Sequence, residues 1–149
     1  MSNISITVKT FPELTNEDIY EILKARFAVF VIEQRCFYLD MDDIDYTSTH
    51  VFMQKGREVV AYARMFPESD TNIWHIGRVL TTIRGKGLGI QLMGQAIKVC
   101  ESKGANAIKI EAQTHAIEFY RRLGFVVTSG EFMDAGIPHV NMHLDINRH

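Results

Sequence analysis

The sequence predicts an α+β domain built on a mixed β-sheet, and we expect it to span residues 1–149 as a single domain. Three strand-like runs follow one another between residues 50 and 80. Helical patterns precede and follow these runs, and a glycine-rich stretch joins the last of them to a helix. With 46% hydrophobic and 23% charged residues, the composition is that of an ordinary globular protein.

The elements follow in the order β, α, β-β-β, α, β, α, β-β. Residues 4–11 alternate apolar and polar side chains, which predicts a strand. A sequence resembling a capping box at residues 15–18 then begins a helix. Its apolar positions recur at helical spacing: Ile19, Ile22, Leu23, Phe27, Phe30 and Val31. An acidic loop follows at residues 38–45.

The antiparallel meander comes next. Residues 50–54 and 58–66 flank a hairpin turn, and a second turn at residues 67–72 leads to the strand at residues 73–80. We expect a helix over residues 89–103 that ends at Gly104, with an apolar stripe of Leu88, Leu92, Ala96 and Val99. A strand (107–112), a short helix (115–123) and two closing strands (125–130 and 139–146) complete the order.

Composition also excludes several classes of protein. A net charge of −2 and a pI near 6.3 argue against a nucleic-acid binder. No apolar run is long enough to span a bilayer and no signal-peptide pattern is visible, so we expect a cytoplasmic protein without a membrane partner. Cys36 and Cys100 lack metal or redox spacing, and Cys100 falls on a helix face that looks buried. His139 and His143 share a strand face, but two histidines do not make a zinc site, and we expect no metal.

The segment "RGKGLG", residues 84–89, is the strongest functional signal. The N–H groups at a helix start have no partner inside the helix and can converge on an anion, while glycine allows a close approach. Arg84 and Lys86 add positive charge. The segment therefore predicts a phosphate or pyrophosphate site, and the alternative is a tight turn that binds nothing. The P-loop and dinucleotide patterns both fail, because Lys86 is followed by Gly87 and the glycines form GxGxG.

The spacing Arg84-x-x-Gly87-x-Gly89 resembles the acetyl-CoA pyrophosphate signature of the GNAT N-acetyltransferases. A second segment, "AIEFYRRLGF", resembles the C-terminal motif of that family. Further segments, among them "RFAVFVIEQRCFYLDMDDID" and "EAQTHAIEFYRRLGF", resemble its ElaA-like branch across nearly the whole chain. The branch has a longer connection where this chain has only "TTI". The resemblance implies the GNAT acyl-CoA N-acyltransferase fold, a three-layer α/β sandwich with a mixed central sheet.

The same resemblance implies that acetyl-CoA is the cosubstrate. Tyr120 would then lie beside the CoA sulfur and donate a proton or hydrogen bond to the departing thiolate, although a packed aromatic is the plain alternative. A backbone N–H on the strand at residues 76–80 would stabilise the negative charge on the thioester oxygen. The residues expected to contact the cofactor are Val79, Leu80, Arg84, Gly85, Lys86, Gly87, Leu88, Gly89, Gln113 and Tyr120.

The sequence leaves the general base and the acceptor site open. Glu33, His50, Glu111, His115 and His139 are all candidates for the base, and we select Glu33 and Glu111 as catalytic residues. Each has a structural alternative: a capping or surface carboxylate for Glu33, a solvent-facing strand residue for Glu111, and a partner for a backbone group for His50. The expected acceptor-binding residues are Glu33, His50, Arg78 and His139.

Two charged features need partners or solvent. Arg78 lies on an otherwise apolar strand, and we expect it to pair with Glu33 or Glu111 or to bind a carboxylate of the acceptor. The four aspartates of the acidic loop either attract a cationic amine or form a solvated loop, and we favour the solvated loop: Asp40, Asp42, Asp43 and Asp45.

The expected function is acetyl transfer from acetyl-CoA to a primary amine of a small molecule or a protein, by direct attack. A regulatory protein that binds acetyl-CoA without turnover is the alternative, and a phosphate-binding domain outside the GNAT family is a weaker third. A homodimer is implied by the resemblance alone.

Overall fold

The computed structural model describes residues 3–146, so the first two and last three residues of the predicted domain lie outside the described part. One mixed sheet forms its centre, in the order β1-β2-β3-β4-β5-β8-β6, with β7 paired to β8. All described pairs are antiparallel except β4 with β5. The strands are β1 (Ile4–Thr10), β2 (Thr49–Lys55), β3 (Glu58–Pro67), β4 (Ile73–Thr81), β5 (Ala107–Gln113), β6 (Val126–Val127), β7 (Phe132–Asp134) and β8 (Ile137–Asp145).

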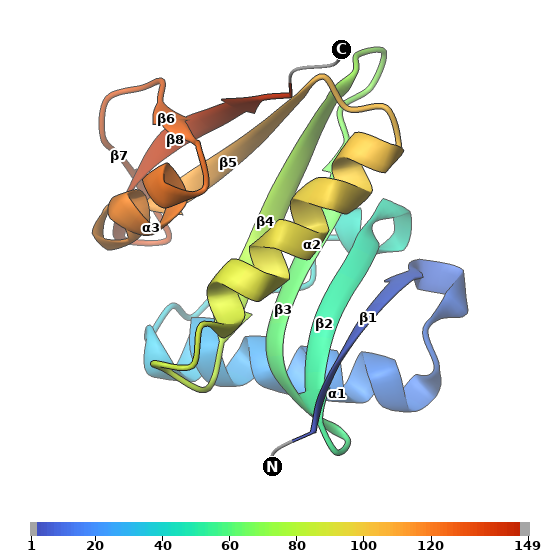
Figure 1. Cartoon of the computed structure of the whole chain (residues 1–149). Coiled ribbons are helices and arrows are strands. Elements are labelled where there is room, and N and C mark those ends of the chain that lie inside the picture. Colours follow the sequence, from blue (N-terminus) through green and yellow to red (C-terminus); the bar gives the residue numbers. More distant parts are fainter. Residues whose placement is uncertain (1–2, 147–149) are drawn as a thin grey trace.

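Helices cover both faces of this sheet. The first helix, α1 (Asn16–Arg26), lies on one face, and α2 (Leu88–Ser102) and α3 (Ile117–Arg122) lie on the other, as Figure 1 shows. Short helical turns complete the fold: η1 (Phe11–Glu13), η2 (Phe27–Glu33), η3 (Ile44–Thr47) and η4 (Thr114–Ala116). This arrangement confirms the predicted α+β class and the three layers.

Each face of the sheet has its own apolar core. On one face, Leu92, Met93 and Ala96 of α2 are fully buried against strand residues such as Met65 and Ile108. On the other, Ile22 and Ala25 of α1, with Val29 and Phe30 of η2, pack on Phe52, Tyr62 and Leu80. Cys100 is completely buried, as expected, and burial raises the pKa of its thiol to about 12.

The first helix begins as predicted but changes character at its end. Thr15 and Asp18 form a reciprocal capping box, with both hydrogen bonds at 3.0 Å. From Phe27 the chain is π-helical, and Gln34 N–H donates to the carbonyl of Val29. The wider turn rotates the following side chains relative to a 3.6-residue period. Phe27 is the first residue of this turn and lies off the buried stripe that runs through Ile22, Ala25 and Val29. Although predicted on the apolar stripe, it is therefore 54% exposed.

The closing strands differ from the expectation. Only Val126–Val127 of the predicted strand at residues 125–130 pairs with β8, and the additional strand β7 forms a hairpin with β8. The hairpin turn consists of Ala135 and Gly136, whose φ angles are 50° and 76°. Tight hairpins of this kind favour asparagine or glycine at both central positions. Alanine at the first position therefore concealed the turn from a sequence pattern.

The feature that positions the site is the separation of β4 from β5. The two strands pair only where Ile73–His75 of β4 meets Ala107–Lys109 of β5, and Figure 1 shows them diverging beyond that point. Where β4 pairs with β3, on the side away from β5, it contains a bulge. The β3 register runs from Tyr62 opposite Leu80 to Arg64 opposite Gly77, so two steps on β3 match three on β4.

Candidate functional site

The candidate site lies at the ends of β4 and β5, where the two strands have separated. The glycine-rich segment follows β4 and leads into α2, and η4 and α3 follow β5. Segments far apart in the sequence therefore meet around one opening of the sheet (Figure 1).

The glycine-rich segment has the backbone of an anion cradle. Gly85 and Gly87 have φ angles of 74° and 72°, a region that side chains with a Cβ rarely adopt. Gly87 is the N-cap of α2 and provides no side-chain cap. The first N–H groups of α2 are therefore available as donors to an anion. No protein atom lies within 4 Å of a Cβ built at either glycine, so the space beside the segment is open.

Gly89 has a different role from its two neighbours. A Cβ at this position would lie 3.1 Å from the ring of Phe119, tighter than an ordinary contact. The absence of a side chain thus lets the first turn of α2 pack on α3. This close approach brings the glycine-rich segment to the helix that carries Tyr120.

Tyr120 is buried between aromatic neighbours. Its ring packs edge-on against Phe119 and Phe125, at centroid distances of 5.0 and 5.9 Å. Its hydroxyl makes no hydrogen bond to another residue between 3 and 146, which leaves it available to a ligand. Burial raises the pKa of Tyr120 to about 12, so the phenol is neutral at physiological pH and can donate a proton but not remove one.

Glu33 and Arg84 meet beside the glycine-rich segment. Arg84 Nη2 donates to Glu33 Oε1 at 2.8 Å, and both side chains are more than half exposed. Lys86 makes no ion pair with any residue of the described part. The positive charge of Lys86 is therefore uncompensated next to the α2 N-terminus, whereas that of Arg84 is shared with Glu33.

Gln113 belongs to a hydrogen-bonded group that the sequence did not reveal. Its amide exchanges hydrogen bonds with the amide of Gln34, at 3.2 and 3.4 Å, and His115 Nε2 lies 2.7 Å from its oxygen. The pair connects the residue after η2 to the end of β5. Glu111, by contrast, is exposed and lies opposite Asn141 of β8.

The two remaining histidines are engaged by the protein itself. His139 is buried, stacks on Phe132, and its Nδ1 lies 2.7 Å from the carbonyl oxygen of Ile137. His50 has Tyr62 Oη at 2.6 Å from Nδ1 and the Asp45 carbonyl at 3.0 Å from Nε2. Burial lowers the pKa of His50, so the neutral ring donates to Asp45 and accepts from Tyr62. The alternative role for His50, partner of a backbone group, is the one that this geometry fits.

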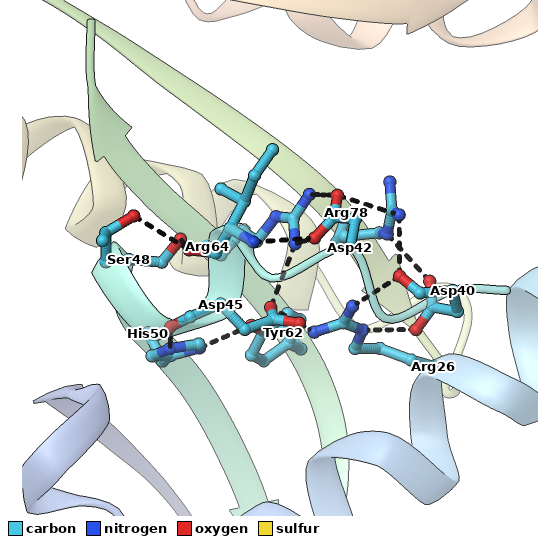
Figure 2. Close-up of polar contacts among 11 residues, drawn as sticks. Arg26, Asp40, Asp42, Asp45, Ser48, His50, Tyr62, Arg64 and Arg78 are labelled. Atoms are coloured by element: carbon cyan, nitrogen blue, oxygen red, sulfur yellow. Dashed lines mark hydrogen bonds and ion pairs between the residues drawn. The ribbon is translucent and has the colours of Figure 1, made fainter. Parts of the chain in front are cut away.

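The expected partners of Arg78 were wrong. Arg78 pairs with neither Glu33 nor Glu111 but with the acidic loop, through Nε to Asp40 Oδ1 at 2.8 Å and Nη2 to Asp42 Oδ2 at 3.4 Å (Figure 2). Asp40 also accepts a hydrogen bond from Nε of Arg26 at 2.7 Å.

The prediction of a solvated acidic loop was wrong for most of its aspartates. Figure 2 shows the cluster: Asp42 is held by Arg64 at 2.6 Å, and Asp45 bridges Arg26 and Arg64 at 2.6 and 3.0 Å. Partial burial disfavours ionised Asp42, but the hydrogen bonds and charge of Arg64 outweigh it and lower its pKa to about 2. The sequence contained a signal of this pairing, because Arg26 and Arg64 lie within apolar runs just as Arg78 does, and a charge there needs a partner.

A cavity of about 200 Å³ lies between η1, α1, the acidic loop and the start of β2. Its walls are mainly apolar, and three of its polar residues, Arg26, Asp45 and His50, are already hydrogen-bonded to the protein. Within residues 3–146 no three potential metal ligands gather in one place, and none of the helices there has the length and apolarity needed to cross a membrane.

Comparison with known proteins agrees over nearly the whole chain. Residues 10–146 match the sequence profile of the acetyltransferase (GNAT) domain. A UPF0039 protein of Schizosaccharomyces pombe is 35% identical over 98% of this chain and 100% of its own. The crystal structure of Escherichia coli ElaA superimposes with a TM-score of 0.90 at 33% identity, over 96% of this chain and 100% of the other. An acyl-CoA N-acyltransferase of Pseudomonas aeruginosa gives a TM-score of 0.87 at 31% identity, over 94% and 99%.

Proposed function

The chain belongs to the GNAT family of acetyltransferases, and from this premise we propose that it transfers an acetyl group from acetyl-CoA to a primary amine. The observation that carries the proposal is an open glycine-rich anion cradle that packs, through the contact of Gly89 with Phe119, on the helix that carries buried Tyr120. An acyl-CoA has a pyrophosphate in its nucleotide part and a thioester at the end of its pantetheine arm, and we propose the cradle for the first and Tyr120 for the second.

The proposed contacts for the cofactor come from both sides of the opening. The N–H groups of Gly87, Leu88 and Gly89, with the charges of Arg84 and Lys86, would hold the pyrophosphate. The thioester end would lie in the opening between β4 and β5, beside the backbone of Val79 and Leu80 on one strand and Gln113 on the other. The acyl group itself is proposed to be acetyl.

The reaction removes two protons from the amine nitrogen and delivers one to the sulfur of CoA. An alkylamine has a pKa of about 10.4, so it reaches the site protonated and must lose a proton before attack. Glu33 or Glu111, directly or through water, would accept it. The nitrogen then bonds to the thioester carbon, the C–S bond breaks, and a backbone N–H of β4 stabilises the charge on the oxygen. Tyr120 gives its proton to the departing CoA thiolate, and the second proton of the attacking nitrogen, passed on through water, restores the phenol.

The acceptor would enter on the η2 side of the opening. Arg78 at the bulge of β4 and Glu33 at the end of η2 are the proposed contacts there, with His50 and His139 farther from the exposed surface. The acceptor is proposed to be a small molecule or a protein lysine, and the reaction cytoplasmic. A nucleic acid or membrane partner is not part of the proposal, whereas a homodimer is.

Calorimetric titration with acetyl-CoA, using ATP and NAD as controls, tests the cofactor site. Selective binding of acetyl-CoA is expected, and equal binding of all three would leave only a general phosphate site. A thiol assay for free CoA with a panel of primary amines then separates an enzyme from a sensor. A protein that binds acetyl-CoA but releases no CoA with any amine would support the regulatory alternative.

A further inference from the structure

We propose that Asp40 is a positioning residue for this reaction: by holding Arg78, it fixes the bulge of β4 and so the direction of the N–H groups that face the thioester oxygen. The inference rests on the proposed function, because it assigns the oxygen to the backbone of β4. It concerns residues that lie outside the glycine-rich segment and Tyr120.

Arg78 has a backbone conformation that needs support. Its φ angle is 52°, in the left-handed region that residues with a Cβ rarely occupy. It lies in the bulge, where neither Arg78 nor Val79 has a register partner on β3. A conformation of this kind persists only where surrounding contacts hold it. Without such contacts, β4 can relax toward regular pairing and turn its N–H groups back to β3.

Asp40 supplies these contacts with both its carboxylate and its backbone. Arg78 Nε donates to Asp40 Oδ1 at 2.8 Å, and Arg78 Nη2 donates to the Asp40 carbonyl at 2.9 Å. The other carboxylate oxygen, Oδ2, accepts from Arg26 Nε at 2.7 Å. Arg26 ends α1 and is only 1% exposed, so the bulge is connected through Asp40 to the rigid helix layer (Figure 2).

The charges of the cluster balance one for one. Three arginines face three aspartates, and all six are linked by ion pairs: Arg26, Arg64, Arg78, Asp40, Asp42 and Asp45. Removing Asp40 alone leaves an uncompensated cation, which lowers stability whatever the role of the residue. A decisive test must therefore separate the position of the backbone from the balance of charge.

Position matters here because stabilisation of an oxyanion depends on where its donors point. A donor acts strongly only within hydrogen-bond distance of the oxygen, so a shift of about 1 Å in β4 costs rate. The pyrophosphate donors at residues 84–89 lie beyond the bulge in a separate segment. Loss of the Asp40 contact should therefore lower kcat and spare the affinity for CoA.

Difference infrared spectroscopy with carbonyl-¹³C acetyl-CoA reports the contact directly and needs no acceptor. In the wild-type protein we expect the carbonyl band to shift to lower frequency on binding. In Asp40→Asn we expect most of this shift to disappear while the dissociation constant for CoA changes by less than about threefold. Asp43→Asn, on the same loop but exposed and without an ion pair in the described part, is the matched control and should keep the shift.

The double variant Asp40→Asn/Arg78→Gly resolves the ambiguity of charge. It removes one negative and one positive charge, and glycine adopts a positive φ without strain. We expect it to recover most of the lost shift, whereas Asp40→Asn/Arg78→Ala, equally balanced but with a Cβ, should not. The comparison of these two double variants also tests the role of Asp40 if Asp40→Asn alone does not fold.

Three results would overturn the inference: a wild-type shift in folded Asp40→Asn, equal shifts in the glycine and alanine double variants, or no carbonyl shift in a wild-type protein that binds acetyl-CoA. Failure of the wild-type protein to bind acetyl-CoA at all would instead contradict the proposed function.

Discussion

At the scale of single residues, Arg26 shows how this protein keeps a charge in its interior. Its side chain is 1% exposed, and each of its three nitrogens donates to Asp40 or Asp45. Burial disfavours the cation, but the hydrogen bonds and charges of the two aspartates outweigh it and raise the pKa of Arg26. The arginine is a structural centre, because it joins α1 to the acidic loop.

Arg26→Met should therefore be strongly destabilising, although methionine fills much of the same space. Buried Asp40 and partly buried Asp45 would lose a partner, and breaking a buried ion pair in this way costs about 3–5 kcal/mol. Urea unfolding followed by circular dichroism measures the change. Lys98→Met, on the exposed face of α2, is the control and should change stability by about 0.5 kcal/mol or less. A similar small change for Arg26→Met would contradict this account.

Tyr120→Phe isolates the phenol from its ring. The ring contacts with Phe119 and Phe125 remain, while the proton donor for the thiolate is lost. We expect kcat to fall by about 10²-fold or more with little change in the affinity for acetyl-CoA. Steady-state kinetics with an amine found in the thiol assay, together with calorimetry, measures both quantities. An unchanged kcat would remove Tyr120 from the acid role.

The pH profile provides a check on the same residue. Tyr120 must be protonated to act as an acid, and its pKa is raised to about 12, so its contribution is lost only as pH rises through that value. The profile of kcat/KM should rise with pH as the amine deprotonates and show no descending limb between pH about 7 and 10. A descending limb in that range that disappears in Tyr120→Phe would contradict the raised pKa.

At the scale of elements, the connection from β4 to α2 carries the cofactor site. Its glycines are required for different reasons. Gly85 and Gly87 adopt a positive φ, and Gly89 must lack a side chain because the ring of Phe119 occupies the space beside it. The segment contributes backbone donors, whereas the buried face of α2 contributes stability through Leu92, Met93 and Ala96. Binding and folding are therefore largely separable here.

Gly87→Val tests this separation. A β-branched residue strains the positive φ and places a Cβ in the open space beside the cradle. We expect acetyl-CoA binding to fall at least about 100-fold, with the circular dichroism spectrum unchanged. Gly94→Ala, inside α2 with nothing within 4 Å of the added Cβ, should bind normally. Normal binding by Gly87→Val would show that the segment does not hold the pyrophosphate.

At the scale of the whole molecule, the cluster of arginines and aspartates joins the helix layer, the acidic loop and strands β3 and β4. It lies beside the apolar core formed by α1, η2 and the sheet, and Tyr62 of that core contacts the cluster directly, with Arg26 Cζ 5.6 Å from the centre of its ring. Loss of the negative charges should therefore weaken the entire α1 face of the sheet rather than one loop.

Stability should fall on acidification because of these aspartates. Partial burial raises the pKa of Asp42 and Asp45, but arginine hydrogen bonds and charges outweigh it and lower both, that of Asp42 to about 2. A carboxyl with a lowered folded pKa stabilises the fold above its unfolded pKa, near 4, and this contribution is lost as pH falls toward 2. Urea midpoints measured from pH 6 to 2.5 should fall most below pH 4. Asp42→Asn should start lower and show a smaller decrease.

The sequence by itself determined the elements and the family. Alternation, helical spacing, the Thr15–Asp18 cap and the glycine-rich segment are local signals, since each depends on residues within about one turn or strand of each other. They predicted the fold class and the mixed sheet, and the resemblance of the glycine-rich segment and of "AIEFYRRLGF" to family motifs predicted the GNAT family; all three are confirmed. The glycine-rich segment also packs on the helix that carries Tyr120, through Gly89 and Phe119, although the roles of the segment and of Tyr120 stay predictions.

Only the tertiary structure decided which charges meet. Asp40 and Arg78 are separated by 38 positions and Gln34 and Gln113 by 79, and no local pattern links them. The ion pairs of the acidic loop, the outward direction of Phe27 and the hairpin at Ala135 likewise depend on neighbours from other elements or on backbone angles. A charge run looks the same in sequence whether water or arginine faces it, because pairing is a property of three-dimensional packing.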